Sequence, residues 1–500
     1  MIKKILYCII VALMIMPVSL GFATGTRDMG FGLFEYPWFI DGLQTYIYEN
    51  PSYLGKFADK IYAERIGITD GKSRGGVIYN PKGNFFIGVD LGLPVDTNLW
   101  NTSAVDSLFH VDVYSAKGVT KYQHSVSGQA MKAYQVELLD QSILDLKDPV
   151  DASEVVGTAT TSPNLREPLN QRNLSLLLSY NFNKFSLGWY AGYATSWKQK
   201  RNSDSATNSH EEYNLINAEY STKLGMNILF NNKFNADIAG FFYMYQLDNN
   251  YMQRKPGIDF DMSYKSKGAM DFGGNVRLNY TMTQKQKIHF YVNYAMLNRS
   301  TEGKMIITDT GTTANNCDAQ DTFERKGQRI GVGVSDEISV SEGMVVYIGF
   351  LSNIELFKNN YYGKDEITPA NNVDKYTLEY KAIEVPIIVG LEAKLSENWK
   401  GRFGLVQNIY KPLSQDGENI TGQGSRTAPT SINETGSSTS TLNLGLSYKL
   451  DNFTFDWLMN VELFTVGPYI VSGKAWTSGN ENPLAFAFAV TYNFVTPIQQ

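Results

Sequence analysis

An alternating stretch near the C-terminus shows the pattern that organises this chain. Between Leu484 and Phe494 every second residue is Leu, Phe, Val or Tyr, and the residues between them are Ala, Thr and Asn. Successive side chains of a strand point to opposite faces, so one face suits lipid and the other suits water. Outer-membrane β-barrels alternate in this way. We expect this last strand to close the sheet and to be recognised by the barrel assembly machinery.

The same alternation recurs along most of the chain after residue 56. Short turns separate the runs on one side, and long polar connections are predicted at roughly 94–173, 198–211, 247–269, 301–325, 359–374, 412–437 and 460–483. Short periplasmic turns and long external loops are typical of outer-membrane barrels. The pattern therefore predicts an all-β fold, a transmembrane antiparallel barrel of 14–16 strands over residues 57–500. The count favours sixteen, and the weakest strands are 57–68, 74–80 and 453–466.

One strand shows a change of phase. Within residues 376–395 the apolar positions run through Tyr376 and Leu378, and then shift to Val385 and Ile387. An extra residue in one strand moves the apolar set to the other face, so the shift predicts a β-bulge. Pro386 lies close to the change and removes a ladder donor.

The N-terminus predicts export. Lys3 and Lys4 precede an apolar core, and small residues surround a cleavage point after Ala23, as in a secretory signal peptide. Residues 1–23 are therefore read as the signal peptide of a bacterial outer-membrane protein that is bounded by outer-membrane lipid. Residues 24–56 are aromatic and irregular, which predicts a plug or hatch inside the lumen. Residues 94–173 form a long loop or an insertion.

Composition excludes several classes of protein. No stretch after the N-terminus has the ~20 apolar residues of a membrane helix, and a net charge of −6 among 500 residues argues against a nucleic-acid partner. The chain has 31 Tyr and 27 Phe, which suits the aromatic girdles of a barrel. No nucleophile elbow, metal-ligand spacing or phosphate-binding glycine motif is present. We therefore expect no enzyme activity, no metal and no cofactor.

Charged side chains fall on the predicted inner face. The candidates for the lumen wall are Asp237, Arg277, Lys287, His289, Glu384, Glu392 and Arg402, and Glu379 and Lys381 are assigned to the same face. Charges are costly against lipid and favoured in a wet lumen. In one interpretation they pair across neighbouring strands and stiffen the wall. In the other they form a constriction that sets ion preference, and their mixed signs then predict weak selectivity.

Four aromatic side chains are also predicted to face inward: Tyr190, Tyr243, Tyr245 and Tyr291. Apolar surface in a lumen needs cover. Two interpretations stay open: these rings pack the plug, or they line a path for an apolar solute.

The segment before the barrel carries a resemblance. Residues 50–54 read Asn-Pro-Ser-Tyr-Leu, where the outer-membrane long-chain fatty-acid transporter family has Asn-Pro-Ala-Gly-Leu. The order of an N-terminal irregular segment and then hairpins, over about residues 24–494, is similar to that family and to its relative, the shuttle barrel of a Bacteroidetes secretion system. The resemblance implies a hatch that includes Asn50, Pro51 and Leu54, a fourteen-stranded barrel and hydrophobic solutes.

These features predict a barrel for passage or capture of small solutes, with hydrophobic solutes favoured by the resemblance. The alternative is a non-transporting partner or adhesin barrel that presents long external loops or carries secreted proteins.

Overall fold

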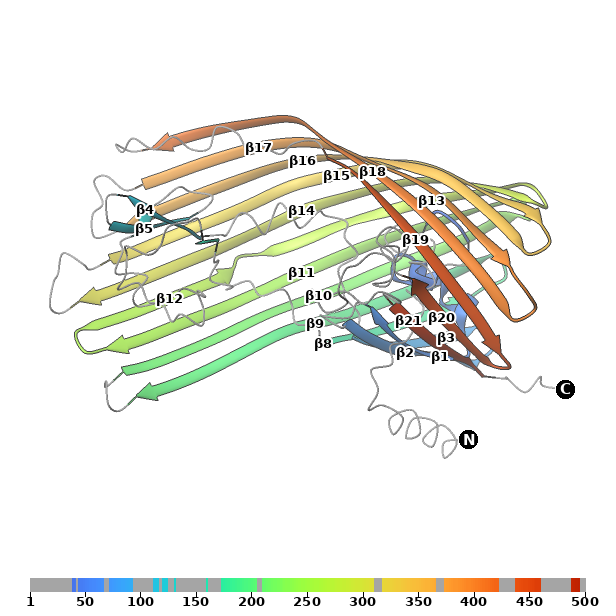
Figure 1. The fold of residues 1–500 in the computed structure, drawn as a ribbon, viewed down its shortest axis with the longest axis horizontal. Coiled ribbons are helices and arrows are strands. Elements are labelled where there is room, and N and C mark those ends of the chain that lie inside the picture. The colour runs from blue at the N-terminus through green and yellow to red at the C-terminus, as the bar shows by residue number, and fades with distance from the viewer. Residues whose placement is uncertain are drawn as a thin grey trace, which may run out of the picture.

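A computed structural model describes residues 38–41, 44–66, 72–92, 111–116, 119–124, 130–131, 159–160, 172–204, 209–309, 317–365, 373–421, 437–459 and 487–494. Most of these residues form one closed antiparallel barrel (Figure 1). None of the helices in the described segments is both long enough and apolar enough to cross a membrane.

The barrel strands follow one another around the sheet. They are β1 (Lys60–Ile66), β2 (Lys72–Lys82), β3 (Phe85–Leu91), β8 (Arg172–Asn181), β9 (Phe185–Asp204), β10 (Ser209–Asn231), β11 (Phe234–Lys255), β12 (Ile258–Ser266), β13 (Ala269–Thr283), β14 (Gln286–Asp309), β15 (Cys317–Ser341), β16 (Met344–Asp365), β17 (Val373–Lys394), β18 (Trp399–Thr421), β19 (Ser437–Leu450), β20 (Phe453–Met459) and β21 (Ala487–Asn493). Pairing of β21 with β1 closes the sheet.

Two of these segments share one place in the sheet. Both β12 and β13 lie between β11 and β14, and they are separated by Lys267 and Gly268, whose φ is 62°. Left-handed backbone favours glycine, so Gly268 permits the interruption. Counted as one strand, they make a barrel of sixteen strands, which confirms the count that the sequence favoured.

A second sheet lies within residues 94–173. Its strands are β4 (Val111–Ala116), β5 (Val119–His124), β6 (Ala130–Met131) and β7 (Ala159–Thr160), in the order β6-β5-β4-β7. Two short 3-10 helices precede the barrel, η1 (Gln44–Tyr48) and η2 (Pro51–Phe57). The signal-peptide prediction falls on residues 1–23, which lie outside the described residues.

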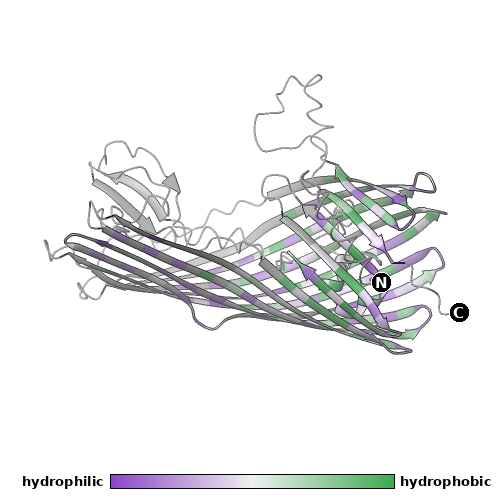
Figure 2. Ribbon diagram, turned by 90° about the horizontal axis from the view of Figure 1, so that it is seen from below, coloured by the Kyte–Doolittle hydropathy of each residue, from purple (hydrophilic) through white to green (hydrophobic). Residues whose placement is uncertain are grey.

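The two faces of the wall differ as the alternation predicted. On β14 the exposed side chains are Phe290, Val292, Tyr294 and Met296, and those between them are buried (Tyr291, Asn293 and Ala295). Beyond Met296 the same outer face carries polar residues such as Glu302. The apolar outer positions gather toward one end of the barrel (Figure 2). This end is the lipid-facing band of a bacterial outer-membrane barrel.

The prediction of long loops was wrong for much of five connections. β10 has 23 residues, which span about 75 Å along the strand, against the ~25 Å height of a lipid-facing band. β11 reaches Lys255 before β12 begins at Ile258, and β14 continues to Asp309. Outside the lipid both faces of a strand are polar, so the period-two signal disappears while the hydrogen-bond ladder continues.

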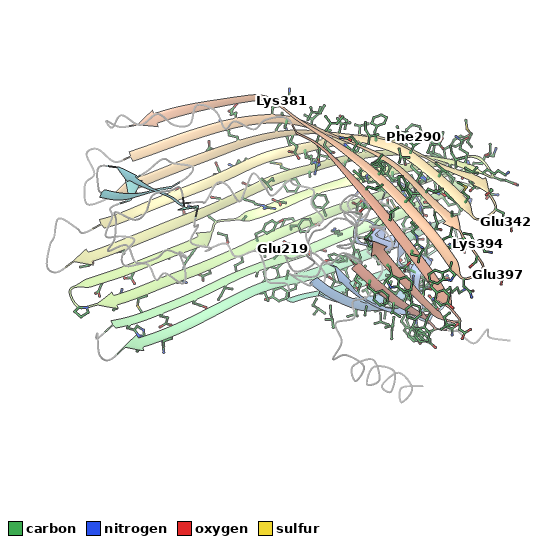
Figure 3. The ribbon with its side chains drawn as sticks, in the orientation of Figure 1. Glu219, Phe290, Glu342, Lys381, Lys394 and Glu397 are labelled. Atoms are coloured by element: carbon green, nitrogen blue, oxygen red, sulfur yellow. The ribbon has the colours of Figure 1, made fainter. Side chains whose placement is uncertain are left out.

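The bulge predicted within residues 376–395 of β17 lies in the partner strand β18 instead. The register shift lies opposite β17, because Lys381 pairs with Ser414 and Ala382 with Pro412, which leaves one extra residue in β18. Glu379 and Lys381 are exposed on the outer face, so their assignment to the inner face was wrong. Figure 3 shows Lys381 at the edge of the region crowded with outward side chains such as Phe290. Glu379 and Lys381 share the outer face with Ile387, so polar residues replace apolar ones on this face where the strand leaves the lipid.

Candidate functional site

The residues before the barrel form a defined structure inside it. The described residues 38–41 and 44–57, here the N-terminal segment, include η1 and η2. Asn50 caps η2: its backbone is extended, and its Oδ1 accepts hydrogen bonds from the Ser52 amide at 3.2 Å and from the Ser52 hydroxyl at 2.6 Å. Pro51 occupies the first turn, where its missing N–H costs nothing. The Asn-Pro pair therefore fixes where η2 begins.

Apolar contacts hold the N-terminal segment against the inner wall. Its buried hydrophobic residues are Trp38, Phe39, Ile40, Tyr46, Ile47, Tyr48, Tyr53, Leu54 and Phe57. Trp38 stacks on Tyr291 of β14, with ring centroids 4.2 Å apart and planes 4° apart. Tyr48 meets Tyr190 of β9 edge-on at 6.5 Å. Two of the four predicted inward aromatic residues thus pack against this segment.

A buried ion pair lies at the centre of this interface. Asp237 of β11 and Arg277 of β13 are direct cross-strand partners, and Arg277 Nε donates to Asp237 Oδ2 at 2.7 Å with both side chains fully buried. Asn227 and Asn279 also donate to Asp237. Tyr53 of η2 donates its hydroxyl to the same carboxylate at 2.8 Å. The wall and the N-terminal segment therefore share one hydrogen-bond network.

Arg277 also contacts the N-terminal segment directly. It donates to the carbonyl oxygens of Trp38 at 3.2 Å and Ile40 at 3.4 Å, and to Asp41 Oδ1 at 3.2 Å. Its guanidinium lies 4.2 Å from the ring centroid of Tyr46. A planar group with several fixed donors suits this multiple contact.

Asp41 extends the network to the next strands. Lys287 of β14 donates to Asp41 Oδ2 at 3.2 Å, and Glu337 of β15 accepts from the Asp41 amide at 3.1 Å. Burial opposes ionisation of Asp41, but the charge of Arg277, with smaller effects of His289, Lys56 and Lys287, holds the pKa of its carboxyl well below its usual range. The segment therefore presents a stable anion to the cationic wall.

Three other titratable groups lie at this interface. His289 is fully buried, with Nδ1 2.6 Å from Asn279 Oδ1 and Nε2 3.7 Å from Glu337. Glu49 lies at the end of η1, where burial raises the pKa of its carboxyl to about 7 against the opposing charges of Lys223 and Arg277. Lys223 of β10 donates to the Tyr48 carbonyl at 2.5 Å. Glu49 belongs to the N-terminal segment, and Lys223 of the wall contacts that segment directly. His289 contacts Asn279 and Glu337, which in turn contact Asp237 and Asp41.

Two wall glycines contact the Asn-Pro pair, and no pattern in the sequence indicated that they belong to a site. Gly188 of β9 and Gly225 of β10 are cross-strand partners. A β-carbon on Gly188 would stand 2.1 Å from the Pro51 carbonyl carbon, and one on Gly225 would stand 2.1 Å from Asn50 Oδ1. At these two positions the wall has no side chain, and its backbone is in direct contact with the N-terminal segment.

The remaining predicted charges lie elsewhere on the wall. Glu384 forms an ion pair with Arg329, and Asn353 donates a hydrogen bond to Glu384 at 3.3 Å. Arg402 donates to Glu392 at 2.8 Å and to Asp456 at 2.9 Å. Asn353–Glu384 and Glu392–Arg402 are direct cross-strand partners, whereas Arg329–Glu384 and Arg402–Asp456 each reach across one intervening strand.

Tyr243 and Tyr245 follow one another along the inner face of β11, with ring centroids 6.5 Å apart. The Tyr245 hydroxyl donates to Asp271 at 2.9 Å, and the guanidinium of Arg299 lies 4.2 Å from its ring centroid. Lys223, which donates to the Tyr48 carbonyl, also lies 5.5 Å from the ring centroid of Tyr243, so Tyr243 borders the contacts of the N-terminal segment, whereas Tyr245 belongs to the cluster with Asp271 and Arg299.

On the lipid-facing side, an apolar groove of about 520 Å³ lies behind the two glycines. Its lining includes Phe85, Leu178, Tyr180, Leu187, Gly188, Trp189, Leu224, Gly225, Met226 and Ile238. Leu224, the most exposed of them, is 66% exposed. Backbone alone therefore separates an apolar groove on the lipid side from Asn50 and Pro51 on the lumen side. Among the described residues, no group of His, Cys, Asp and Glu is arranged to hold a metal ion.

Comparisons with known proteins concern the fold. No family model and no curated protein matches the chain. It is similar to a FadL homologue of Pseudomonas aeruginosa, with 10% identity over 95% of this chain and 100% of that chain at a TM-score of 0.38. It is also similar to the toluene transporter TbuX of Ralstonia pickettii, with 11% identity over 88% and 92% of the chains at a TM-score of 0.35.

A further similarity is to the ferric yersiniabactin uptake receptor FyuA of Yersinia pestis, with 8% identity and a TM-score of 0.40. It covers 80% of this chain and 53% of the receptor, so this chain spans about half of that protein's length. The resemblance to the fatty-acid transporter family noted in the sequence is thus matched by a weak similarity to a FadL homologue.

Proposed function

We propose that this outer-membrane barrel passes or captures small hydrophobic solutes and that its N-terminal segment acts as a plug. The observation that supports the proposal is that the wall consists of backbone alone at Gly188 and Gly225. An apolar groove on the lipid side meets Gly188 and Gly225, and the other side of these glycines touches the N-terminal segment. A small apolar molecule needs an apolar concave surface to leave water.

The proposal assigns two tasks to the contacts described above. The charged network around Arg277 fixes the plug in one position, because several of its bonds end on the N-terminal segment. The groove supplies an apolar surface of a size that fits a small ligand, since such sites measure about 300–1,000 Å³. A solute then moves between the groove and the lumen when the plug shifts.

Filling the groove tests this proposal. We expect Leu224→Trp to lower uptake of the apolar dye N-phenyl-1-naphthylamine several-fold in cells that express the protein, because the bulky indole ring occupies the groove. The matched control is Val332→Trp, at a lipid-facing position of β15 that is 55% exposed and does not line the groove. Equal uptake in the wild type, both variants and cells without the protein would exclude hydrophobic transport.

A further inference from the structure

A groove lined by both polar and apolar groups lies on the outer face of the sheet beyond the lipid-facing band. It has a volume of about 440 Å³. Two adjacent cross-strand rows on β10, β11, β12 and β14 line it: Glu212, Met252, Asp261 and Ile306 in one row, and Asn214, Asn250, Ser263 and Lys304 in the other. The groove thus crosses four neighbouring strands instead of following one.

The height of these rows above the lipid-facing band follows from the rise and tilt of the strands. Asn214 lies on the same face of β10 as Tyr220, which is 40% exposed, and is six residues farther out, about 20 Å along the strand. With a strand tilt of about 40° this is a rise of about 15 Å. A phospholipid headgroup layer is only about 5–8 Å thick on each side. The groove therefore stands above phospholipid headgroups, at the height of a longer surface chain.

The charges in the groove are largely compensated. Glu212 accepts from Arg201 at 2.7 Å, and Asp261 accepts from Arg254 at 2.8 Å. Each carboxylate therefore has a guanidinium partner, and Lys304 adds one ammonium group to the lining. This balance disfavours a strongly ionic ligand.

The other lining groups suit a hydroxylated ligand. Asn214, Asn250 and Ser263 stand side by side on three strands, and amide and hydroxyl groups both donate and accept hydrogen bonds. Met252 and Ile306 place apolar surface beside them. A sugar ring combines hydroxyl edges with apolar C–H faces, so it matches both kinds of surface.

From this arrangement we propose that the groove binds the carbohydrate part of the glycolipid in the outer leaflet. The groove is on the face that lipid surrounds lower down, so a membrane-anchored sugar chain has direct access to it. Its rows run around the barrel, which lets a chain of several sugars lie across the strands. This site is separate from the proposed transport path and does not depend on it.

Binding by the purified full-length mature protein in detergent tests the inference. The probes are lipopolysaccharide that carries its core sugars, the bare lipid anchor after removal of those sugars, and phosphatidylethanolamine. We expect the sugar-bearing glycolipid to bind at least about ten-fold more tightly than the bare anchor. The double variant Asn214→Val/Asn250→Val is expected to remove this difference, because valine suits a strand and lacks the amide.

The matched control is Asn298→Val/Asn360→Val, which makes the same change on outer faces of β14 and β16 outside the groove. It should retain the preference for the sugar-bearing glycolipid. Both doubles should keep wild-type dye uptake, so failure here is distinct from failure of the transport proposal. Equal affinity of the wild type for glycolipid and bare anchor would overturn the inference, and so would unchanged binding by the Asn214→Val/Asn250→Val protein.

Discussion

Arg277→Met is expected to destabilise the barrel by about 3–5 kcal/mol, the largest effect of any single change considered for this wall. The substitution leaves Asp237 fully buried without its ionic partner, and an uncompensated buried charge is costly. It also removes the donors to Trp38, Ile40 and Asp41. Thermal unfolding in detergent, followed by circular dichroism and by heat-modifiable migration in gels, measures the loss.

Two controls separate the buried charge from the lost contacts. The double variant Asp237→Leu/Arg277→Met should regain most of the stability, because removal of both partners leaves no buried charge, while its N-terminal segment stays loosened. Arg254→Met breaks an ion pair whose side chains are 34% and 45% exposed, and it should cost less than about 1 kcal/mol. Equal losses for Arg277→Met and Arg254→Met would show that the buried network is not a main source of stability.

Gly188→Val is expected to displace the N-terminal segment and open the lumen. Its β-carbon would stand 2.1 Å from the carbonyl carbon of Pro51 and 2.2 Å from the Ser52 amide nitrogen, both backbone atoms that cannot rotate away. An unobstructed barrel of about sixteen strands encloses an aqueous channel. We expect hydrolysis of nitrocefin by a periplasmic β-lactamase to rise at least several-fold in intact cells, because the lumen then admits a polar solute.

The control for this change is Gly240→Val on β11, which is separated from β9 by β10. The nearest atom to a β-carbon there is 3.7 Å away, an ordinary contact. This variant should keep the low rate of hydrolysis and the same yield of folded, heat-modifiable barrel. If Gly188→Val folds normally and hydrolysis stays at the wild-type rate, the N-terminal segment does not close the lumen.

The sequence predicted the barrel well where lipid imposes a pattern. The outer face of β14 alternates because every second side chain must meet hydrocarbon, and such strands led to the count of sixteen. Residues 301–309 and 317–325 were read as part of a loop because water on both sides removes that requirement. The same physical cause explains the misplaced bulge in residues 376–395.

The candidate site was predictable only in part. Asp237, Arg277 and Lys287 were found because charges on the inner face of a membrane strand stand out. Their common partners, Asp41 and Tyr53, were missed because the contacts join residues far apart in the sequence, such as Asp41 and Arg277. No local pattern encodes such a contact. Gly188 was missed for the same reason, because it matters through its contacts with Pro51 and Ser52, which lie far from it in the sequence.

The most direct test of this account is single-channel conductance in planar bilayers, with the mature chain compared with a chain that lacks residues 24–56. We expect the mature chain to be closed for most of the recording and the shortened chain to conduct, because we propose that the N-terminal segment, which contacts the wall at Arg277 and Gly188, closes the lumen. Conductance that is equal in the two folded proteins, whether both are open or both are closed, would contradict the proposal that this segment is the plug.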